Sequence, residues 1–168
     1  MTPSELLADA FGRIRDGVHA VVDGAAEDLF TRQAGERSNT IAWLVWHLTR
    51  VQDDHVADAA GSPQIWTHRG WSGRFGLPLD EHDTGYGHSP EQVGAVRAHP
   101  ELLLGYHDAV ADRTLEYVGG LGSGDLDRIV DVRWDPPVTL GVRLVSVVAD
   151  DLQHVGQAAF LRGLLAPS

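Results

Sequence analysis

Residues 41–48 of the chain read Ile-Ala-Trp-Leu-Val-Trp-His-Leu, an apolar run interrupted by one histidine. The residue before it, Thr40, is of a type that caps helix N-termini. The run and its continuation place apolar side chains at the spacing of one helix face: Ile41, Leu44, Val45, Leu48 and Val51. This stretch therefore predicts a helix that begins at Ile41 and reaches about Ala60.

Three further segments carry the same helical periodicity. The first runs from Pro3 to about Asp23 and opens with Thr-Pro-Ser-Glu, the signature of a capping box with proline at the first helical position. The next opens with Ser-Pro-Glu-Gln at residues 89–92, meets a proline at position 100 that kinks or restarts it, and ends at Gly119. The last follows Thr139 and meets no proline until Pro167. Four long helices predict an all-α four-helix bundle.

Two connections join these helices. Residues 61–88 form a long crossover between helices two and three, rich in glycine, proline and aromatic residues: Trp66, Trp71, Phe75 and Tyr86. Such a long segment is expected to be ordered, either by packing its aromatics, which we favour, or by covering a functional site. Residues 122–138 form the second connection, whose Trp-Asp-Pro-Pro stretch is extended or turned. No repeat divides the chain, so we expect one domain over residues 1–168.

Composition excludes several classes of function. The 168 residues carry a formal charge of -11, and no run of basic residues is present, which disfavours nucleic acid and anionic membranes as partners. The absence of cysteine excludes disulfides, thiolate zinc sites and a cysteine nucleophile. The N-terminal residues do not resemble a secretory signal, and no apolar run has the length of a membrane span, so we expect a cytoplasmic protein.

The residues best suited to chemistry lie on helices two and four. Asp150 and His154 are four residues apart, on one helix face, and both are ligand types for first-row metal ions. His47 lies in the apolar run, where a buried imidazole needs a partner; a carbonyl or carboxylate in the core is the simpler alternative. Asp150 and Asp151 sit among valines and leucines, so at least one faces packed surface, where an ionised carboxylate is costly unless paired or bound to metal. His47, Asp150 and His154 are therefore candidate ligands of one divalent metal, with Asp151 as the alternative carboxylate.

Two short motifs resemble the signatures of a known superfamily. Residues 41–48 and the His-Val-Gly-Gln of residues 154–157 are similar to those of the DinB-like (YfiT-like) metal-dependent bundles, and the order of elements matches over nearly the whole chain. The resemblance implies a divalent metal, often zinc or nickel, held here by His47, Asp150 and His154. Many members have histidine at the position of Asp150, whereas mycothiol-dependent maleylpyruvate isomerase is similar in using a carboxylate there.

Three further residues are candidates for catalysis. Three protein ligands would leave an open coordination position for water or substrate. Gln157 lies one turn beyond His154 and can orient it by a hydrogen bond. Asp54 follows the helix-two histidine by seven residues and can orient a ligand or act as a base, although a surface carboxylate is the simpler interpretation. Arg143 precedes the carboxylate ligand by seven residues and can bind an anionic substrate group or simply balance an acid. The remaining central histidines form no pattern of a second site: His55, His68, His82, His88, His99 and His107.

Three functions are compatible with these features. The first is a metal-dependent S-transferase or isomerase that uses a low-molecular-weight thiol of the mycothiol type and an electrophilic second substrate, so that the nucleophile arrives with the cofactor. The second is metal-assisted hydrolysis with Asp54 as the proton acceptor. The third is a non-catalytic, stress-linked binding or dimerisation module. A homodimer formed through exposed apolar helix faces is compatible with all three.

Overall fold

The computed structural model describes residues 1–166. Four long helices, five shorter helical segments and one two-stranded hairpin follow one another within this range. In chain order they are α1 (Pro3–Val22), η1 (Glu27–Thr31), α2 (Ile41–Ala60), α3 (Ile65–His68), α4 (Trp71–Phe75), α5 (Pro90–Ala95), α6 (Pro100–Gly119), η2 (Ser123–Asp127), β1 (Ile129–Asp131), β2 (Val138–Thr139) and α7 (Leu140–Leu165).

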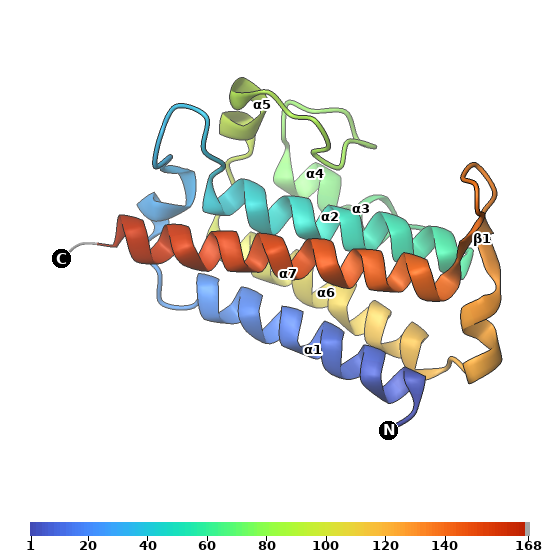
Figure 1. Cartoon of the computed structure of the whole chain (residues 1–168). Coiled ribbons are helices and arrows are strands. Elements are labelled where there is room, and N and C mark those ends of the chain that lie inside the picture. Colours follow the sequence, from blue (N-terminus) through green and yellow to red (C-terminus); the bar gives the residue numbers. More distant parts are fainter. Residues whose placement is uncertain (167–168) are drawn as a thin grey trace.

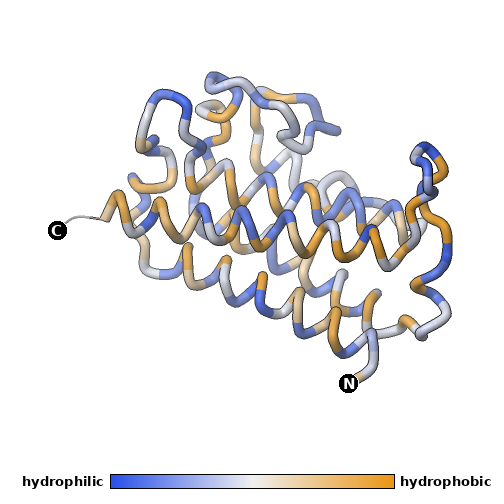
Figure 2. The backbone as a smooth tube through the Cα atoms, in the orientation of Figure 1, coloured by the Kyte–Doolittle hydropathy of each residue, from blue (hydrophilic) through white to orange (hydrophobic). Residues whose placement is uncertain are grey.

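The four long helices form the predicted bundle (Figure 1). Both α1 and α2 pack against α6 and α7, so α1 and α2 occupy opposite corners. As the colours of Figure 1 show, α2 and α7 run in opposite directions as neighbours. Hydrophobic residues, whose backbone is orange in Figure 2, recur along each long helix. Their buried side chains join in one continuous core. None of the helices within residues 1–166 combines the length and apolar character needed to cross a bilayer.

The helix starts confirm the predicted caps. Thr2 accepts a hydrogen bond from the backbone of Glu5, whose carboxylate accepts one from the backbone of Thr2, which completes a capping box. The hydroxyl groups of Thr40 and Thr139 cap α2 and α7 by accepting hydrogen bonds from the backbones of Trp43 and Val142. Side chains at these positions satisfy backbone N–H groups that have no partner inside the helix. The bounds of helices one, two and four therefore agree with those expected from the sequence.

The third predicted helix is divided into two. The segment opened by Ser89 ends as α5 at Ala95, and a new helix, α6, begins at Pro100. His99, the N-cap residue of α6, has φ -65° and ψ 142°. This extended conformation is expected before proline, whose ring disfavours helical backbone at the preceding residue. Of the two expected outcomes at residues 99–100, a restart is the one observed.

The crossover is ordered by its aromatic side chains. Trp66 and Phe75 are buried, with ring centroids 5.1 Å apart, and Tyr106 of α6 lies 5.1 Å from Trp66. This packing confirms the favoured expectation for these aromatics. The segment also contains two short helices, α3 and α4, which sequence periodicity did not predict because each has too few residues to show a repeat.

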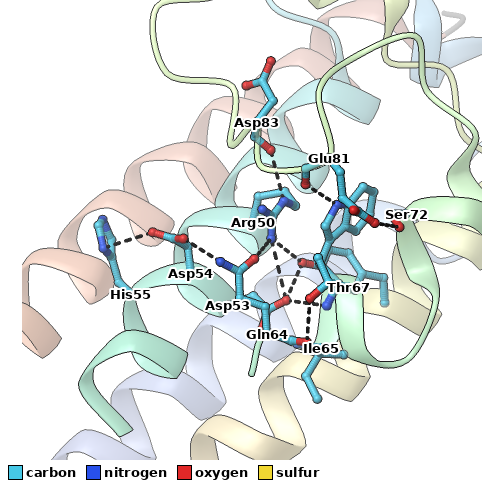
Figure 3. A network of polar contacts seen from close by, with 12 residues as sticks. Arg50, Asp53, Asp54, His55, Gln64, Ile65, Thr67, Ser72, Glu81 and Asp83 are labelled. Atoms are coloured by element: carbon cyan, nitrogen blue, oxygen red, sulfur yellow. Dashed lines mark hydrogen bonds and ion pairs between the residues drawn. The ribbon is translucent and has the colours of Figure 1, made fainter. Parts of the chain in front are cut away.

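A buried polar network fastens the crossover to α2 (Figure 3). The carboxylate of Asp53 accepts hydrogen bonds of 2.8 Å from the backbone of Ile65, the backbone of Trp66 and the hydroxyl of Tyr106. Arg50 is fully buried and donates to the backbone carbonyl of Asp83 at 3.2 Å and to the side chain of Gln64 at 2.8 Å. These bonds fix the path of residues 64–83 over α2. Neither Arg50 nor Asp53 was singled out by the sequence pattern.

The second connection contains a short hairpin. Strand β1 pairs antiparallel with β2, with Ile129 opposite Thr139. The expectation of extended or turned backbone omitted this pairing, since strands of three and two residues carry no period-two pattern. The hairpin rests beside the start of α7 and brings Asp131 to within 2.9 Å of Arg143.

Candidate metal centre and adjoining cavity

The three predicted ligands meet between α2 and α7. His47, Asp150 and His154 each offer a ligand atom, and these atoms all lie within 4.8 Å of one another. The ring centroids of the two histidines are 4.8 Å apart, and Nε2 of His154 is 3.7 Å from Oδ1 of Asp150. The arrangement follows from the packing of α2 against α7, because a four-residue spacing places both α7 residues on the side that faces α2.

His47 is held in one orientation by the crossover. Its Nδ1 donates a hydrogen bond to the backbone carbonyl of Thr84, and the ring stacks on Trp43 at a centroid distance of 4.5 Å. A carbonyl oxygen only accepts, so Nδ1 carries the proton and Nε2 keeps its lone pair. Burial lowers the pKa of His47, against the opposing effect of the bond to Thr84. The side chain is therefore neutral and able to ligate near neutral pH.

His154 has the same tautomer as His47, but a side chain and not a backbone carbonyl accepts from its Nδ1. Its Nδ1 lies 3.1 Å from Oε1 of Gln157, an acceptor atom. The ring therefore donates through Nδ1 and leaves the Nε2 lone pair free, as at His47. The structure thus places Gln157 where it can orient the imidazole, and it does not place Gln157 among the residues that line the adjoining cavity.

Asp150 completes a cluster of acceptors without a donor. Its Oδ2 is buried and has no hydrogen-bond partner among the described residues. The neighbouring groups are imidazoles that offer lone pairs, so the cluster is electrostatically unfavourable unless a cation joins it. Two imidazoles and one carboxylate are a ligand set that suits a divalent first-row ion. The three side chains therefore fit a metal ion.

Asp151 lies elsewhere. The side chain is fully buried, and within residues 1–166 neither carboxylate oxygen has a hydrogen-bond partner. Burial, and then the charge of Asp150, raise the pKa of Asp151 well above its usual value. The expectation that at least one of the two acids faces packed surface holds for Asp151. It is Asp150 that faces His47, as the helix phase required.

The crossover approaches His47 closely at Gly85. This residue has φ +93°, and a Cβ built there would lie 2.7 Å from Nδ1 of His47 and 3.0 Å from Trp46. Two residues earlier, Asp83 accepts a hydrogen bond from the backbone of Gly85, and its carboxylate lies 2.9 Å from Nε2 of His88. Only glycine fits a positive φ at this contact distance. No sequence pattern could have identified Thr84, because the group that contacts His47 is its backbone carbonyl.

A cavity of about 480 Å³ adjoins the cluster and is bounded by His47 and Asp150 at one end. Its walls are apolar and come from α2, β2 and α7: Val51, Val138, Val142 and Val147. Two exposed aromatics, Tyr86 and Trp134, stand at its rim. Three other aromatics of the crossover, Trp66, Trp71 and Phe75, do not line it. Trp134 was not expected there, since it comes from the second connection.

The other end of the cavity is polar and includes two of the predicted catalytic residues. Asp54 lines the cavity, and its Oδ1 accepts a hydrogen bond of 2.7 Å from Gln64. Arg143 donates through Nη2 to Asp131 at 2.9 Å and through Nη1 to Nδ1 of His55 at 2.8 Å. Arg143 thus balances an acid, as the simpler expectation had it, although the acid is Asp131. His55 was not expected in this site. Its position on the same face of α2 as His47 is the feature of the sequence that could have identified it.

The chain resembles known proteins over almost its full length. It matches the family model described as Mycothiol-S-transferase over residues 6–167. A crystal structure of a conserved protein from Enterococcus faecalis has 27% sequence identity to it, covers 98% of both chains and superposes with a TM-score of 0.91. No curated protein matches the chain.

Proposed function

Because the chain belongs to the mycothiol-S-transferase family and has the DinB/YfiT-like fold, we propose that it transfers a low-molecular-weight thiol of the mycothiol type to an electrophilic carbon. The proposed cofactor is one divalent metal, zinc or nickel, held by His47, Asp150 and His154. The observation that carries the proposal is a cluster of three ligand atoms, with no hydrogen-bond donor among them, that lies beside a cavity.

A divalent cation bound by these residues would lower the pKa of a coordinated thiol and so favour the thiolate at neutral pH. His47 and His154 offer Nε2 lone pairs, fixed by the bonds of Nδ1 to Thr84 and Gln157. Asp150 supplies the negative charge that offsets part of the cation's charge. The valine walls would hold the apolar part of the electrophile close to the sulfur.

The reaction balances without a redox partner. The sulfur lone pair forms the new bond to carbon, the electron pair of the broken bond leaves with the leaving group or moves into a conjugated group, and the thiol proton passes to solvent or product. The lack of cysteine suits this scheme, because the sulfur belongs to a substrate.

The competing proposal is metal-assisted hydrolysis with Asp54 as the base. The observation in its favour is that Asp54 lines the same cavity. Against it, Oδ1 of Asp54 is engaged by Gln64, and the residue follows His47 by seven positions on α2, a rise of about 10 Å. We therefore place hydrolysis second.

Calorimetry on untagged, zinc-loaded protein with mycothiol tests the proposal. Binding should release a proton, counted by titration in buffers of different ionisation enthalpy. Cobalt-substituted protein should gain a sulfur-to-metal charge-transfer band. His47→Ala should lose both effects, whereas His68→Ala, which changes an exposed histidine on α3, should keep them. No binding of mycothiol or other common cellular thiols by fully metallated protein would overturn the transferase proposal and favour hydrolysis or a non-catalytic role.

A further inference from the structure

His55 is the unassigned histidine at the polar end of the cavity. It lies on α2, eight residues after His47, and about a third of its side chain is exposed. Its Nδ1 is 2.8 Å from Nη1 of Arg143. In the described part of the chain its Nε2 makes no hydrogen bond and is not among the buried unpaired atoms. One ring nitrogen is therefore engaged, and the other is available to a ligand.

The contact with Arg143 defines the tautomer of His55. A guanidinium group can only donate, so Nδ1 of His55 must accept and the ring proton must be on Nε2. The carboxylate of Asp54, drawn beside His55 in Figure 3, is 3.6 Å from Nδ1, beyond hydrogen-bond distance. Arg143 is itself immobilised, since its side chain is 12% exposed and Nη2 is bonded to the buried Asp131.

The surroundings also keep the ring uncharged. Burial, and then the positive charge of Arg143, lower the pKa of His55. The carboxylates that face it from α2 and α7, those of Asp54, Asp58 and Asp150, oppose this effect without reversing it. His55 is therefore neutral at pH 7 and above: Nε2 carries the ring proton, and Nδ1 is occupied by the hydrogen bond from Arg143.

We propose that Arg143 holds His55 as a fixed Nε2–H donor, and that this donor binds an acceptor oxygen of the electrophile. This inference rests on the proposed transferase function and specifies the second substrate: an apolar molecule whose reactive carbon is conjugated to a carbonyl. His47 and His55 are separated by about 12 Å of rise along α2, with Val51 on the wall between them. That length accommodates a sulfur, a conjugated carbonyl and a hydrogen bond in sequence.

In the step we propose, the sulfur lone pair forms a bond to the β-carbon of the conjugated carbonyl. The π electrons of the carbon–carbon double bond move toward the carbonyl oxygen, which becomes an enolate. His55 stabilises that negative charge by its hydrogen bond and keeps its proton. The proton lost by the thiol then returns to the α-carbon, so the product is the saturated thioether.

Nitrogen NMR of histidine tests the tautomer directly, without turnover. In zinc-loaded protein, long-range proton–nitrogen spectra should show His55 protonated at Nε2 and bare at Nδ1 from pH 6.5 to 9. Arg143→Met, which removes the donor to Nδ1, should shift the ring toward a mixture of tautomers. Addition of cyclohexanone, a saturated ketone without the double bond needed for conjugate addition of a thiol, should move the Nε2 resonance of wild type. An Nδ1–H ring, a charged ring in this range, or no response to the ketone would overturn the inference.

Kinetic measurements then show whether His55 acts as a hydrogen-bond donor or as a general base. His55→Gln keeps an N–H donor but has no basic nitrogen, and His55→Phe has neither. With a cyclic enone as electrophile, we expect His55→Phe to lose about 100-fold in kcat/KM and His55→Gln to keep most of the rate. With an alkyl halide, which has no carbonyl, both variants should resemble wild type. Equal losses in both variants, or a loss with the halide, would contradict the donor role. Absence of all turnover in wild type would refute the transferase proposal. It would not refute the tautomer of His55 or its binding of a carbonyl oxygen, because the NMR experiment measures both without turnover.

Discussion

His47 and His55 lie on the same helix, yet their free nitrogen atoms have opposite properties. At His47 the Nδ1 contact is a carbonyl, so Nε2 accepts; at His55 the contact is a guanidinium, so Nε2 donates. The sequence predicts that His47 is buried on α2, but it does not predict which atom meets Nδ1. Those partners, Thr84 and Arg143, lie 37 and 88 residues away along the chain.

Removal of one ligand tests the role of the metal in stability. We expect His154→Ala to lose metal binding and to keep its helical circular dichroism, because the continuous apolar core does not depend on an ion. Metal content by mass spectrometry and thermal unfolding measure the two effects. His68→Ala is the matched control. Complete unfolding of His154→Ala would show that the metal is structural.

Gly85 offers a test of the crossover's effect on the centre. In Gly85→Ala the new methyl group would meet Nδ1 of His47, so we expect metal affinity to fall by about 10- to 100-fold. Gly87→Ala is the control, because φ is +73° there and a Cβ would meet nothing within 4 Å. Both variants should lose about 1–2 kcal/mol of unfolding free energy through backbone strain. Chelator competition measures affinity, and equal affinities in the two variants would contradict a role for Thr84 in orienting His47.

At the scale of elements, the sequence predicted the long helices well and the crossover poorly. Helices α1, α2 and α7 have caps and many periodic apolar residues, which act locally and are visible in the sequence. The path of the crossover depends on Arg50 and Asp53, charged residues that periodicity does not assign to the interior. The convergence of the three candidate ligands could be predicted because the four-residue spacing on α7 follows helix geometry. The cavity could not be predicted, since β2 and the second connection form part of its wall.

The contact between α2 and α6 contains a histidine whose titration should be measurable. His107 is fully buried, Nδ1 is 3.0 Å from the hydroxyl of Thr49, and Nε2 has no partner among residues 1–166. Burial lowers the pKa of His107 from 6.5 to about 4. The unfolded chain therefore binds a proton that the folded chain does not between pH 6.5 and 4, and stability is lost as pH falls through this window.

We expect this loss to amount to about 3 kcal/mol of unfolding free energy. Urea unfolding of wild type and His107→Leu at several pH values between 4 and 7 measures it. The variant should have the shallower dependence on pH, and His68→Leu should retain the wild-type dependence. Parallel curves for wild type and His107→Leu would show that His107 does not titrate in this way.

At the scale of the molecule, the outer face of α7 stands out against the acidic remainder. The chain carries a net charge of -11, yet no charged side chain of α7 falls among the exposed residues of this helix, which lies within the described range. The exposed positions of α7 include Val145, Leu152, Phe160 and Leu164. Two copies of an acidic chain repel least where both surfaces are uncharged and apolar. We therefore expect a symmetric homodimer through this face.

Light scattering after size-exclusion chromatography should give twice the 18.2 kDa of one chain. The double change Leu152→Glu and Phe160→Glu should yield a monomer, because it places four carboxylates in the interface of a symmetric dimer. Leu6→Glu, on the exposed side of α1, serves as the control and should stay dimeric. A wild-type monomer at all concentrations would refute the expectation.

The ligands come from distant parts of the chain, with His47 on the second long helix and the other two on the last. On a ribosome, which extends the chain from its N-terminus, α2 emerges long before α7 has been made. The nascent chain therefore has only one of the three candidate ligands at this place until translation reaches Asp150, and the set is complete only after His154. On the proposed function, metal uptake at this centre would thus come late in biosynthesis, and a truncated product would leave the ribosome without a complete coordination sphere.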